Sequence, residues 1–387
     1  MSFTDLRTDL ETWARVDVVG ASFGVLKLTR DGETVDVALP RTERSTGVHH
    51  RDFEVTYDAG LGVEIDLMRR DLTINAMARR LSDGALIDPF DGAHDLGTRV
   101  LRAVGNATER FNEDPLRMLR LARFMAKLEF TPEPATREAT RALATLVSSV
   151  APERVQTELW GLLAARSADG VLSALRFLRD TGLLAVCIPE FAACIGFDQQ
   201  NPHHHLTLDE HIFQAVQRAA SRGVSVRARL ALLLHDIGKP DTQTFSADGI
   251  AHYYHHEARS ADLTRVILER LKFSNDVTDS TVKLVANHMR PPRDATLKTL
   301  RRFKRDLDDL WRDALEVRLA DRLAHAPEPF DPFAEFQRCT DTLEHLPVEL
   351  EGFDERQLAI SGAELMRVFD LQPGHAIGNL KNAPRKP

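Results

Sequence analysis

Two arginine-rich segments carry side chains that could bind a nucleotide. They cover residues 69–78 and 113–120, and both place guanidinium and carboxylate groups at short spacings within stretches whose pattern is mostly helical. A solvated helix face usually pairs Glu with Lys four residues later, whereas the basic residue here is nearly always Arg. Because the planar guanidinium forms bidentate contacts with phosphates and base edges, these segments predict a nucleotide site.

The second segment also suggests how one base could be chosen over another. Asp114, Arg117 and Arg120 recur every three residues, which predicts that they lie along one side of a helix. Cytosine and adenine both present an exocyclic amine beside a ring-nitrogen acceptor, so an aspartate can accept from the amine while an arginine donates to the ring. Uracil and guanine present the opposite order and would leave buried groups unpaired, at ~1–3 kcal/mol each. The pattern therefore predicts selection of C and A without a template.

A second cluster combines imidazole and carboxylate groups near predicted helix ends. An apolar helix over residues 227–234 leads into a His-Asp pair and ends at the Gly-Lys-Pro of residues 238–240. Mixed nitrogen and oxygen donors suit Mn, Fe, Co, Ni or Zn better than Ca. The predicted metal ligands are His211, His235, Asp236 and Asp321, with His256 and His288 as candidates for a second metal or for the leaving group.

The elements that must position these residues divide the chain. Alternating, Val-rich runs within residues 16–40 predict strands, and Asp31-Gly32 predicts a hairpin between the last two. From Glu64 onward the pattern is mostly helical, and helices of period 3.6 are expected over about 113–185. A linker rich in turn formers covers residues 189–205. A second helical unit follows over about 207–326, where Thr207 and Glu210 predict a capping box.

Composition excludes several classes of protein. At 387 residues two to three domains are expected, and the formal net charge of −8 argues against non-specific nucleic-acid binding. No apolar run reaches the ~18 residues of a membrane span, and the first residues show no signal-peptide pattern. The three cysteines have neither metal-type nor redox-type spacing, so a reduced cytoplasm is predicted.

The arginine segments, taken with their order in the chain, resemble class II tRNA nucleotidyltransferases (CCA-adding enzymes) and their poly(A) polymerase relatives. The resemblance covers roughly residues 16–200. It implies that Asp114 and Arg117 recognise the incoming base and that four residues hold the ribose and triphosphate: Arg70, Asp71, Asn75 and Arg120. Taken singly, each of these could equally be a helix cap or part of an intramolecular ion pair. The motifs are the strand pair, Arg70-Asp71 with Asn75, residues 87–92, 99–102, 113–124 and 151–159.

The same resemblance implies a catalytic Mg²⁺ held by an Asp-x-Asp strand after a glycine-rich turn. Neither is found in the 15 residues before Val16, and Glu64-Ile-Asp66 has the spacing but lies on the helix leading into Arg69. Asp36, in a predicted strand, takes the place of the family's third carboxylate and is the expected catalytic residue there. We therefore expect negligible nucleotide addition, through a late start of the chain or through loss of the activity.

The histidine cluster resembles the HD phosphohydrolase superfamily, whose ligands follow the order His, His-Asp, Asp. In some bacterial CCA-adding enzymes such a domain shows metal-dependent phosphatase or 2′,3′-cyclic phosphodiesterase activity. The resemblance implies a metal that generates hydroxide and polarises the phosphoryl group. Lys239 is the further candidate catalytic residue, because its ammonium group could neutralise phosphate charge. The neighbouring histidines at 203–205 are interpreted as part of the polar linker.

These observations predict an α+β fold that is mostly α. The expected parts are a truncated nucleotidyltransferase-type β/α head (1–83), a helical neck and body (84–190), an all-α HD domain (191–330) and a tail (331–387). The first hypothesis is a tRNA nucleotidyltransferase with tRNA, CTP and ATP as partners and no membrane. The alternatives are a metal-dependent phosphohydrolase that retains an RNA- or nucleotide-binding unit, and a non-enzymatic tRNA-binding remnant. The oligomeric state stays open. The weaker candidates for tRNA contact are Arg99, Arg102, Arg110, Arg154 and residues 301–305.

Overall fold

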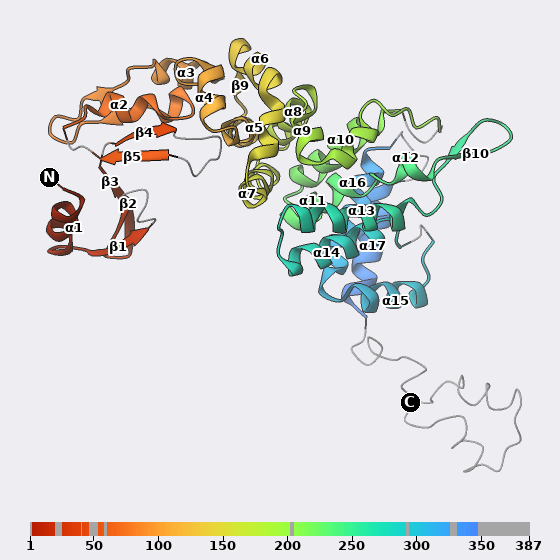
Figure 1. The fold of residues 1–387 in the computed structure, drawn as a ribbon. Coiled ribbons are helices and arrows are strands. Elements are labelled where there is room, and N and C mark those ends of the chain that lie inside the picture. Colours follow the sequence, from red (N-terminus) through yellow and green to blue (C-terminus); the bar gives the residue numbers. More distant parts are fainter. Residues whose placement is uncertain are drawn as a thin grey trace, which may run out of the picture.

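The computed structural model describes residues 2–19, 25–39, 41–45, 53–57, 60–201, 205–291, 294–325 and 331–346, with the backbone alone for residues 19, 41–45 and 53–57. Within these residues the fold is mostly helical, as predicted, and strands gather near the N-terminus (Figure 1). His203, His204 and most of the predicted tail lie outside the described residues. In the described part of the chain, no helix has the length and apolar character needed to cross a bilayer.

The first part of the head is a helix followed by a three-stranded antiparallel sheet in the order β1-β2-β3. Asp31 and Gly32 both have positive φ, 52° and 83°, which is the backbone conformation of a tight turn between β2 and β3. Glycine adopts positive φ readily, because it has no Cβ. The hairpin predicted at this position is therefore confirmed. The elements are α1 (Phe3–Glu11), β1 (Arg15–Val19), β2 (Val25–Arg30) and β3 (Glu33–Ala38).

The rest of the head contains far less helix than the pattern after Glu64 predicted. Thr73 donates its backbone N–H to the Arg102 carbonyl at 2.9 Å, and Leu72 forms a bridge with Ala103, so tertiary pairing replaces the predicted helix. Gly92 packs against this turn so closely that a Cβ would lie 2.3 Å from the Thr73 oxygen. The elements are β4 (Arg41–Ser45), β5 (Phe53–Tyr57), α2 (Val63–Met68), η1 (Thr73–Asn75), β6 (Ala78–Arg79), β7 (Leu86–Ile87), α3 (Gly92–Thr98) and β8 (Val100–Leu101).

The middle of the chain is a helical unit built around α5. Its buried side chains recur at helical spacing, and α5 packs against both α7 and α8. Proline opens α6 and α7 at a position where the missing N–H costs no hydrogen bond. The elements are α4 (Ala107–Glu113), α5 (Leu116–Leu128), β9 (Thr131–Pro132), α6 (Pro134–Leu143), η2 (Ala144–Ser149), α7 (Pro152–Leu163), α8 (Ala168–Asp180), α9 (Leu183–Cys187) and η3 (Pro189–Cys194).

The second helical unit begins with α10, which packs against α8, α11 and α16. Thr207 stands at the N-cap as predicted, but the predicted capping box is wrong, because the Thr207 side chain makes no cap hydrogen bond. The carboxylate of Glu210 is bonded instead to Arg176 and Arg179 of α8. The elements are α10 (Leu208–Ser221), α11 (Val226–Leu234), α12 (Lys239–Thr242), β10 (Thr244–Phe245), β11 (Ala251–His252), α13 (His256–Arg270), α14 (Asn275–Ala286), α15 (Leu297–Leu307), η4 (Asp308–Leu310), α16 (Trp311–Leu323) and α17 (Pro332–Glu344).

One continuous hydrophobic core joins the two helical units. It runs from Leu72, beside the first arginine segment, through α5, α8 and α10 to Leu343 of α17. A buried arginine reinforces the junction: Arg229 of α11 donates to the carbonyls of Leu163 and Ala165, both at 2.8 Å, where α7 ends. The helices that carry the arginine segments and those that carry the histidines thus share a single packed interior.

Candidate nucleotide pocket and metal centre

The two arginine segments meet at one pocket of about 410 Å³. The turn between α2 and η1 supplies one side of it, the junction of α4 with α5 the other, and α7 contributes one arginine. All six residues predicted to bind the nucleotide line this pocket, together with four more. The lining consists of Arg69, Arg70, Asp71, Asn75, Asp114, Leu116, Arg117, Arg120, Phe124 and Arg154.

Asp114 reaches the pocket from a turn, although the sequence predicted that it lies on a helix. It ends α4 with φ −142° and ψ 99°, because the proline at 115 excludes helical backbone for the residue before it. Its Oδ1 accepts the Leu116 N–H at 3.1 Å and so holds the start of α5. Arg117 follows within the first turn of α5, which brings the two side chains to the same pocket despite the break between the helices.

The hydrogen bonds of Asp114 and Arg117 leave both groups with unused capacity. Asp114 Oδ2 accepts from Arg154 Nη2 at 2.8 Å, so two of its roughly four acceptor sites are engaged. Arg117 donates from Nη1 to Glu113 and to the Arg110 carbonyl, and from Nη2 to the Arg69 carbonyl at 2.7 Å. Among the described residues these bonds occupy three of its five N–H groups. An acceptor and a donor therefore remain side by side.

Asp71 forms the buried anchor of the pocket. Its carboxylate accepts from Arg120 Nε at 2.7 Å and from Asn75 Nδ2 at 3.1 Å. Burial raises the pKa of this carboxyl, but the Arg120 charge and the hydrogen bonds outweigh it and hold the pKa below the ordinary value. Arg70 is more open, with 47% of its side chain exposed and one bond to Asp66 at 3.2 Å. A fixed anion–cation pair and an accessible arginine are thus available to a polyphosphate.

Two residues of the lining were not predicted for this pocket, and one predicted catalytic residue lies outside it. Arg154 was considered only as a weak tRNA contact, and Phe124, which follows Arg120 by four residues, was not considered for its position on the same side of α5. Asp36 does not line the pocket; it is exposed on β3, opposite Lys27 of β2. Figure 1 places its sheet at the far end of the head from α5. Its assignment as a catalytic residue stays a prediction.

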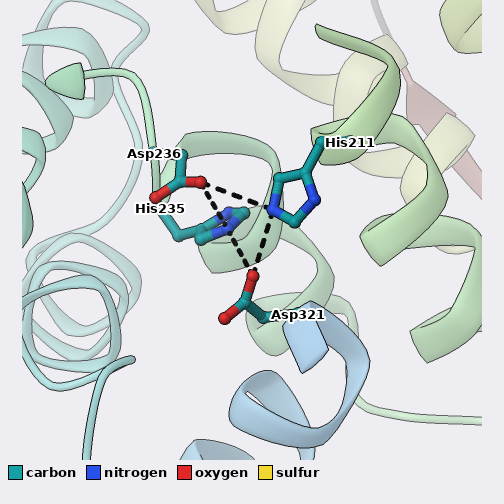
Figure 2. Close-up of side chains that lie close together, drawn as sticks. All are labelled: His211, His235, Asp236 and Asp321. Carbon is teal, nitrogen blue, oxygen red and sulfur yellow. Dashed lines mark hydrogen bonds and ion pairs between the residues drawn. The ribbon is translucent and has the colours of Figure 1, made fainter. Parts of the chain in front are cut away.

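The second site brings together the predicted quartet of His211, His235, Asp236 and Asp321 (Figure 2). His211 Nε2 lies 3.0 Å from Asp321 Oδ1 and 3.4 Å from Asp236 Oδ2. His235 Nε2 lies 3.3 Å from each of the same two oxygens. The three elements that meet here are α10, the end of α11 and α16, and all four side chains are buried.

The backbone orients these imidazoles for metal binding. Nδ1 of His235 lies 2.7 Å from the Leu232 carbonyl, and Nδ1 of His211 lies 3.3 Å from that of Ala324, which favours the proton on Nδ1 and leaves Nε2 as the donor atom. Among the described residues, His235 Nε2 and both Asp236 oxygens are buried without a hydrogen bond, although Asp236 Oδ2 is ion-paired with Lys239. Buried donor atoms left in this state fit a divalent cation, the group that would satisfy them together.

A second group of donors adjoins the first and shares Asp236 with it. His256 Nε2 and His288 Nε2 lie 3.3 and 3.6 Å from Asp236 Oδ1, on the opposite oxygen from His211 and His235. Their Nδ1 atoms also face backbone carbonyls, each at 2.7 Å. Burial lowers the pKa of His288 to about 3, so its imidazole is neutral and fit for coordination. The arrangement offers two adjacent groups of donor atoms, each of which could hold a metal ion.

Two further groups border the quartet. Lys239, the other predicted catalytic residue, is buried with its Nζ 2.6 Å from Asp236 Oδ2 and 3.0 Å from Gln199 Oε1. His325, which the sequence analysis missed, stacks on His211 with ring centroids 4.9 Å apart and lies 3.8 Å from Asp321 Oδ1. The signal was present, since His325 follows Asp321 by four residues at the end of α16.

Comparisons with known proteins cover the three parts of the chain that carry these residues. Family models match a poly A polymerase head domain at residues 2–102, a "probable RNA and SrmB- binding site of polymerase A" at 129–195 and an HD domain at 208–326. The fold is similar to the CCA-adding enzyme of Bacillus stearothermophilus in complex with CTP, with a TM-score of 0.62, 23% identity and coverage of 96% of this chain and 78% of that one. The Thermotoga maritima CCA-adding enzyme complexed with tRNA gives a TM-score of 0.55, 16% identity and coverage of 100% and 82%.

Curated relatives carry the stronger likeness. The multifunctional CCA protein of Azoarcus sp. (strain BH72) is 40% identical over 315 residues, which cover 78% of this chain and 74% of the relative. That of Burkholderia pseudomallei (strain 1106a) is 40% identical over 263 residues, or 65% of this chain and 61% of the relative. The resemblance inferred from the arginine and histidine motifs is confirmed: this chain belongs to the family of the multifunctional CCA proteins, the CCA-adding tRNA nucleotidyltransferases that carry an HD domain.

Proposed function

We propose that this chain acts in the addition of C and A to tRNA 3′ ends, and that its arginine pocket selects the incoming CTP or ATP. The observation that carries the proposal is the unused acceptor of Asp114 beside the unused donors of Arg117. A cytosine or adenine edge supplies the matching amine and ring nitrogen. Arg70, Asn75 and the Asp71–Arg120 pair would hold the ribose and the phosphates.

The pocket supplies selection and not a metal site of its own. Its two carboxylates, Asp71 and Asp114, are each paired with an arginine at 2.7–2.8 Å. Among the described residues, the side-chain groups that could hold a metal ion both lie in the second helical unit. The residues present at the pocket therefore do not fit the Mg²⁺ implied for nucleotide transfer, and no step of that transfer is assigned to them.

Equilibrium binding tests this function without relying on turnover. We expect CTP and ATP to bind at least ~10-fold more tightly than UTP and GTP, since one or two unpaired groups cost ~1–3 kcal/mol each. Asp114→Ala should reduce that preference while leaving affinity for inorganic triphosphate unchanged. Arg141→Ala is the matched control, because Arg141 is exposed and its partners among the described residues are Glu138 and the Asp180 carbonyl. Equal affinity for all four nucleotides in the parent protein would contradict the proposal.

A second function is supported by the metal centre: hydrolysis of a phosphate ester. Two donor groups that share one carboxylate suit two transition-metal ions of the Mn, Fe, Co, Ni or Zn type. A divalent metal bound there would supply an activated water and polarise a phosphoryl oxygen. Asp236 and Asp321 would hold the positive charge, the neutral imidazoles would fix the geometry, and Lys239 would balance charge at Asp236 Oδ2.

Metal content and hydrolysis test this second function separately. The parent protein, loaded with Mn²⁺ and desalted, should retain close to two ions per chain. Asp236→Ala removes the shared ligand and should abolish both retention and hydrolysis of a 2′,3′-cyclic nucleotide. His205→Ala, an exposed histidine outside both donor groups, is the matched control and should change neither quantity. Full metal retention by Asp236→Ala would refute the assignment.

Several statements rest on these two proposals. The partners tRNA, CTP and ATP and a cytoplasmic location go with these functions, while the domain boundaries at residues 83, 190 and 330 stay predictions. Relatives in complex with CTP and with tRNA support the choice of partners, as does the match to an RNA-binding model at residues 129–195.

A further inference from the structure

A partly exposed pair of stacked rings, His252 and Tyr254, comes shortly before His256 of the second donor group. Tyr254 lies on His252 with ring centroids 5.4 Å apart and an angle of 12° between the ring planes. Tyr254 is nevertheless 67% exposed, and its hydroxyl makes no hydrogen bond to another described residue. Exposure of a large aromatic side chain adds nothing to the stability of the fold. One face of the stack is therefore open to a ligand.

The neighbouring tyrosine shows the contrast between a structural and an available ring. Tyr253 donates its hydroxyl to the Gln199 carbonyl at 2.5 Å, and its ring packs beside Phe197 with centroids 6.3 Å apart. Its backbone carbonyl lies 2.7 Å from Nδ1 of His256. Tyr253 thus anchors the chain at the end of the hairpin formed by β10 and β11, and it orients the metal-ligand candidate His256. Tyr254 serves neither purpose.

The backbone holds Tyr254 close to the metal centre. One residue, His255, separates it from His256, so the two Cα atoms lie no more than about 7 Å apart. Between them His255 adopts the left-handed conformation, φ 64° and ψ 18°, which is costly for a residue with a side chain. This turn starts α13 with His256 while the chain before it carries Tyr254 outward into solvent. A strained residue at such a junction is typical of functional sites.

We propose that Tyr254, supported by His252, is a stacking platform for the base of a nucleotide or RNA 3′ end whose phosphate is held at the metal centre. The inference rests on the phosphohydrolase activity proposed above and adds to it a residue that binds the base of the substrate. A parallel aromatic stack with one open face suits a flat heterocycle of any sequence. A phosphate ester without a base would gain nothing from this platform.

Kinetics on two phosphomonoesters test the platform. With Mn²⁺-loaded protein, release of phosphate is measured from 2′-AMP and from glycerol 2-phosphate. Because stacking on an aromatic side chain contributes ~1–3 kcal/mol per base, Tyr254→Ala should raise KM for 2′-AMP by about 10-fold or more. The same variant should leave KM for glycerol 2-phosphate unchanged, and Tyr254→Trp should retain the parent's KM for 2′-AMP. Equal changes for both substrates, or no change for either, would overturn the inference.

The hairpin formed by β10 and β11 contains a second exposed aromatic residue, Phe245, that serves as a matched control. The ladder pairs Thr244 with His252 and Phe245 with Ala251, so Phe245 lies on the opposite face of the ribbon from His252. Phe245 is also exposed, at 55%, and Phe245→Ala should leave KM for 2′-AMP at the parent value. An equal loss in Phe245→Ala would show that the hairpin as a whole matters and not the stack.

A binding measurement separates this inference from the proposed hydrolysis. Equilibrium dialysis of 2′-AMP is carried out with Arg117→Ala protein, in which the nucleotide pocket is disabled, and repeated after adding Tyr254→Ala. If hydrolysis fails but Tyr254→Ala still weakens binding by about 10-fold, the platform stands and the proposed reaction is wrong. Equal affinity in the two proteins, or none in either, would overturn the platform whatever the hydrolysis assay shows.

Discussion

Arg229→Met should lower the free energy of unfolding more than a surface substitution of equal size, because Arg229 lies at the junction between the two helical units. Arg229 is 6% exposed and donates to three carbonyls: Val224 at 2.9 Å, and Leu163 and Ala165 at 2.8 Å. Hydrogen bonds from a charged group contribute ~1.5–3 kcal/mol each, while removal of a buried guanidinium returns part of its desolvation cost. Burial of that group also lowers its pKa. We expect a net loss of about 3 kcal/mol.

Urea unfolding followed by tryptophan fluorescence measures this loss. Trp160 lies on α7 and Trp311 on α16, so the two units both report. The matched control is Arg227→Met, two residues earlier on α11, whose guanidinium pairs with Asp276 at 3.2 Å in an exposed position and should contribute at most ~1 kcal/mol. A difference between the variants below about 1 kcal/mol would refute the role given to Arg229 as the joint of a shared core.

Three further outcomes follow from the structure. Arg154→Met removes one of the two hydrogen bonds that orient Asp114, so CTP affinity should fall several-fold in equilibrium binding, while the melting temperature stays within ~1 °C because this ion pair is partly exposed to solvent. The pKa of Asp71 is held below its ordinary value, so the ion pair with Arg120 is lost only when the pH falls to that lowered pKa. Both pH 7 and pH 5 lie above the ordinary pKa of an aspartate, so CTP affinity should show no loss due to this pair between them. Titration with CTP at the two pH values checks this. Burial raises the pKa of Cys187 to about 12, so its thiol should not react with a disulfide reagent at pH 8 until urea unfolds the chain, and fast reaction in the folded protein would contradict its burial.

The hairpin and the metal quartet could be predicted because local chemistry determines both. Asp31-Gly32 supplies two residues that tolerate positive φ, which suffices for a tight turn between strands. His235 and Asp236 directly follow a helix that is mostly apolar, so packing that buries this helix brings its end into the interior. The same reasoning did not reach His325, whose contact with His211 depends on how α16 packs against α10.

The local structure of the nucleotide pocket could not be predicted as well. The pattern over residues 69–78 is helical, but pairing of Leu72 and Thr73 with residues 102–103 overrides that preference. Pro115 did contain the information that Asp114 leaves the helix, since a residue before proline avoids helical backbone. Glu210 has the spacing of a capping box, but its carboxylate is hydrogen-bonded to two arginines of α8 that are distant in sequence. Hydrogen bonds between a guanidinium and a carboxylate join two opposite charges, whereas the backbone N–H that a capping box requires is neutral.

The most direct test of the central claim is a structure of this chain bound to CTP. The account predicts that the exocyclic amine of cytosine donates to Asp114 while Arg117 donates to the ring nitrogen, with the triphosphate near Arg70 and Arg120. Asp114 would keep its bonds to Leu116 and Arg154, since those occupy other acceptor sites. A cytosine bound outside this pocket, or one whose edge faces neither Asp114 nor Arg117, would contradict it.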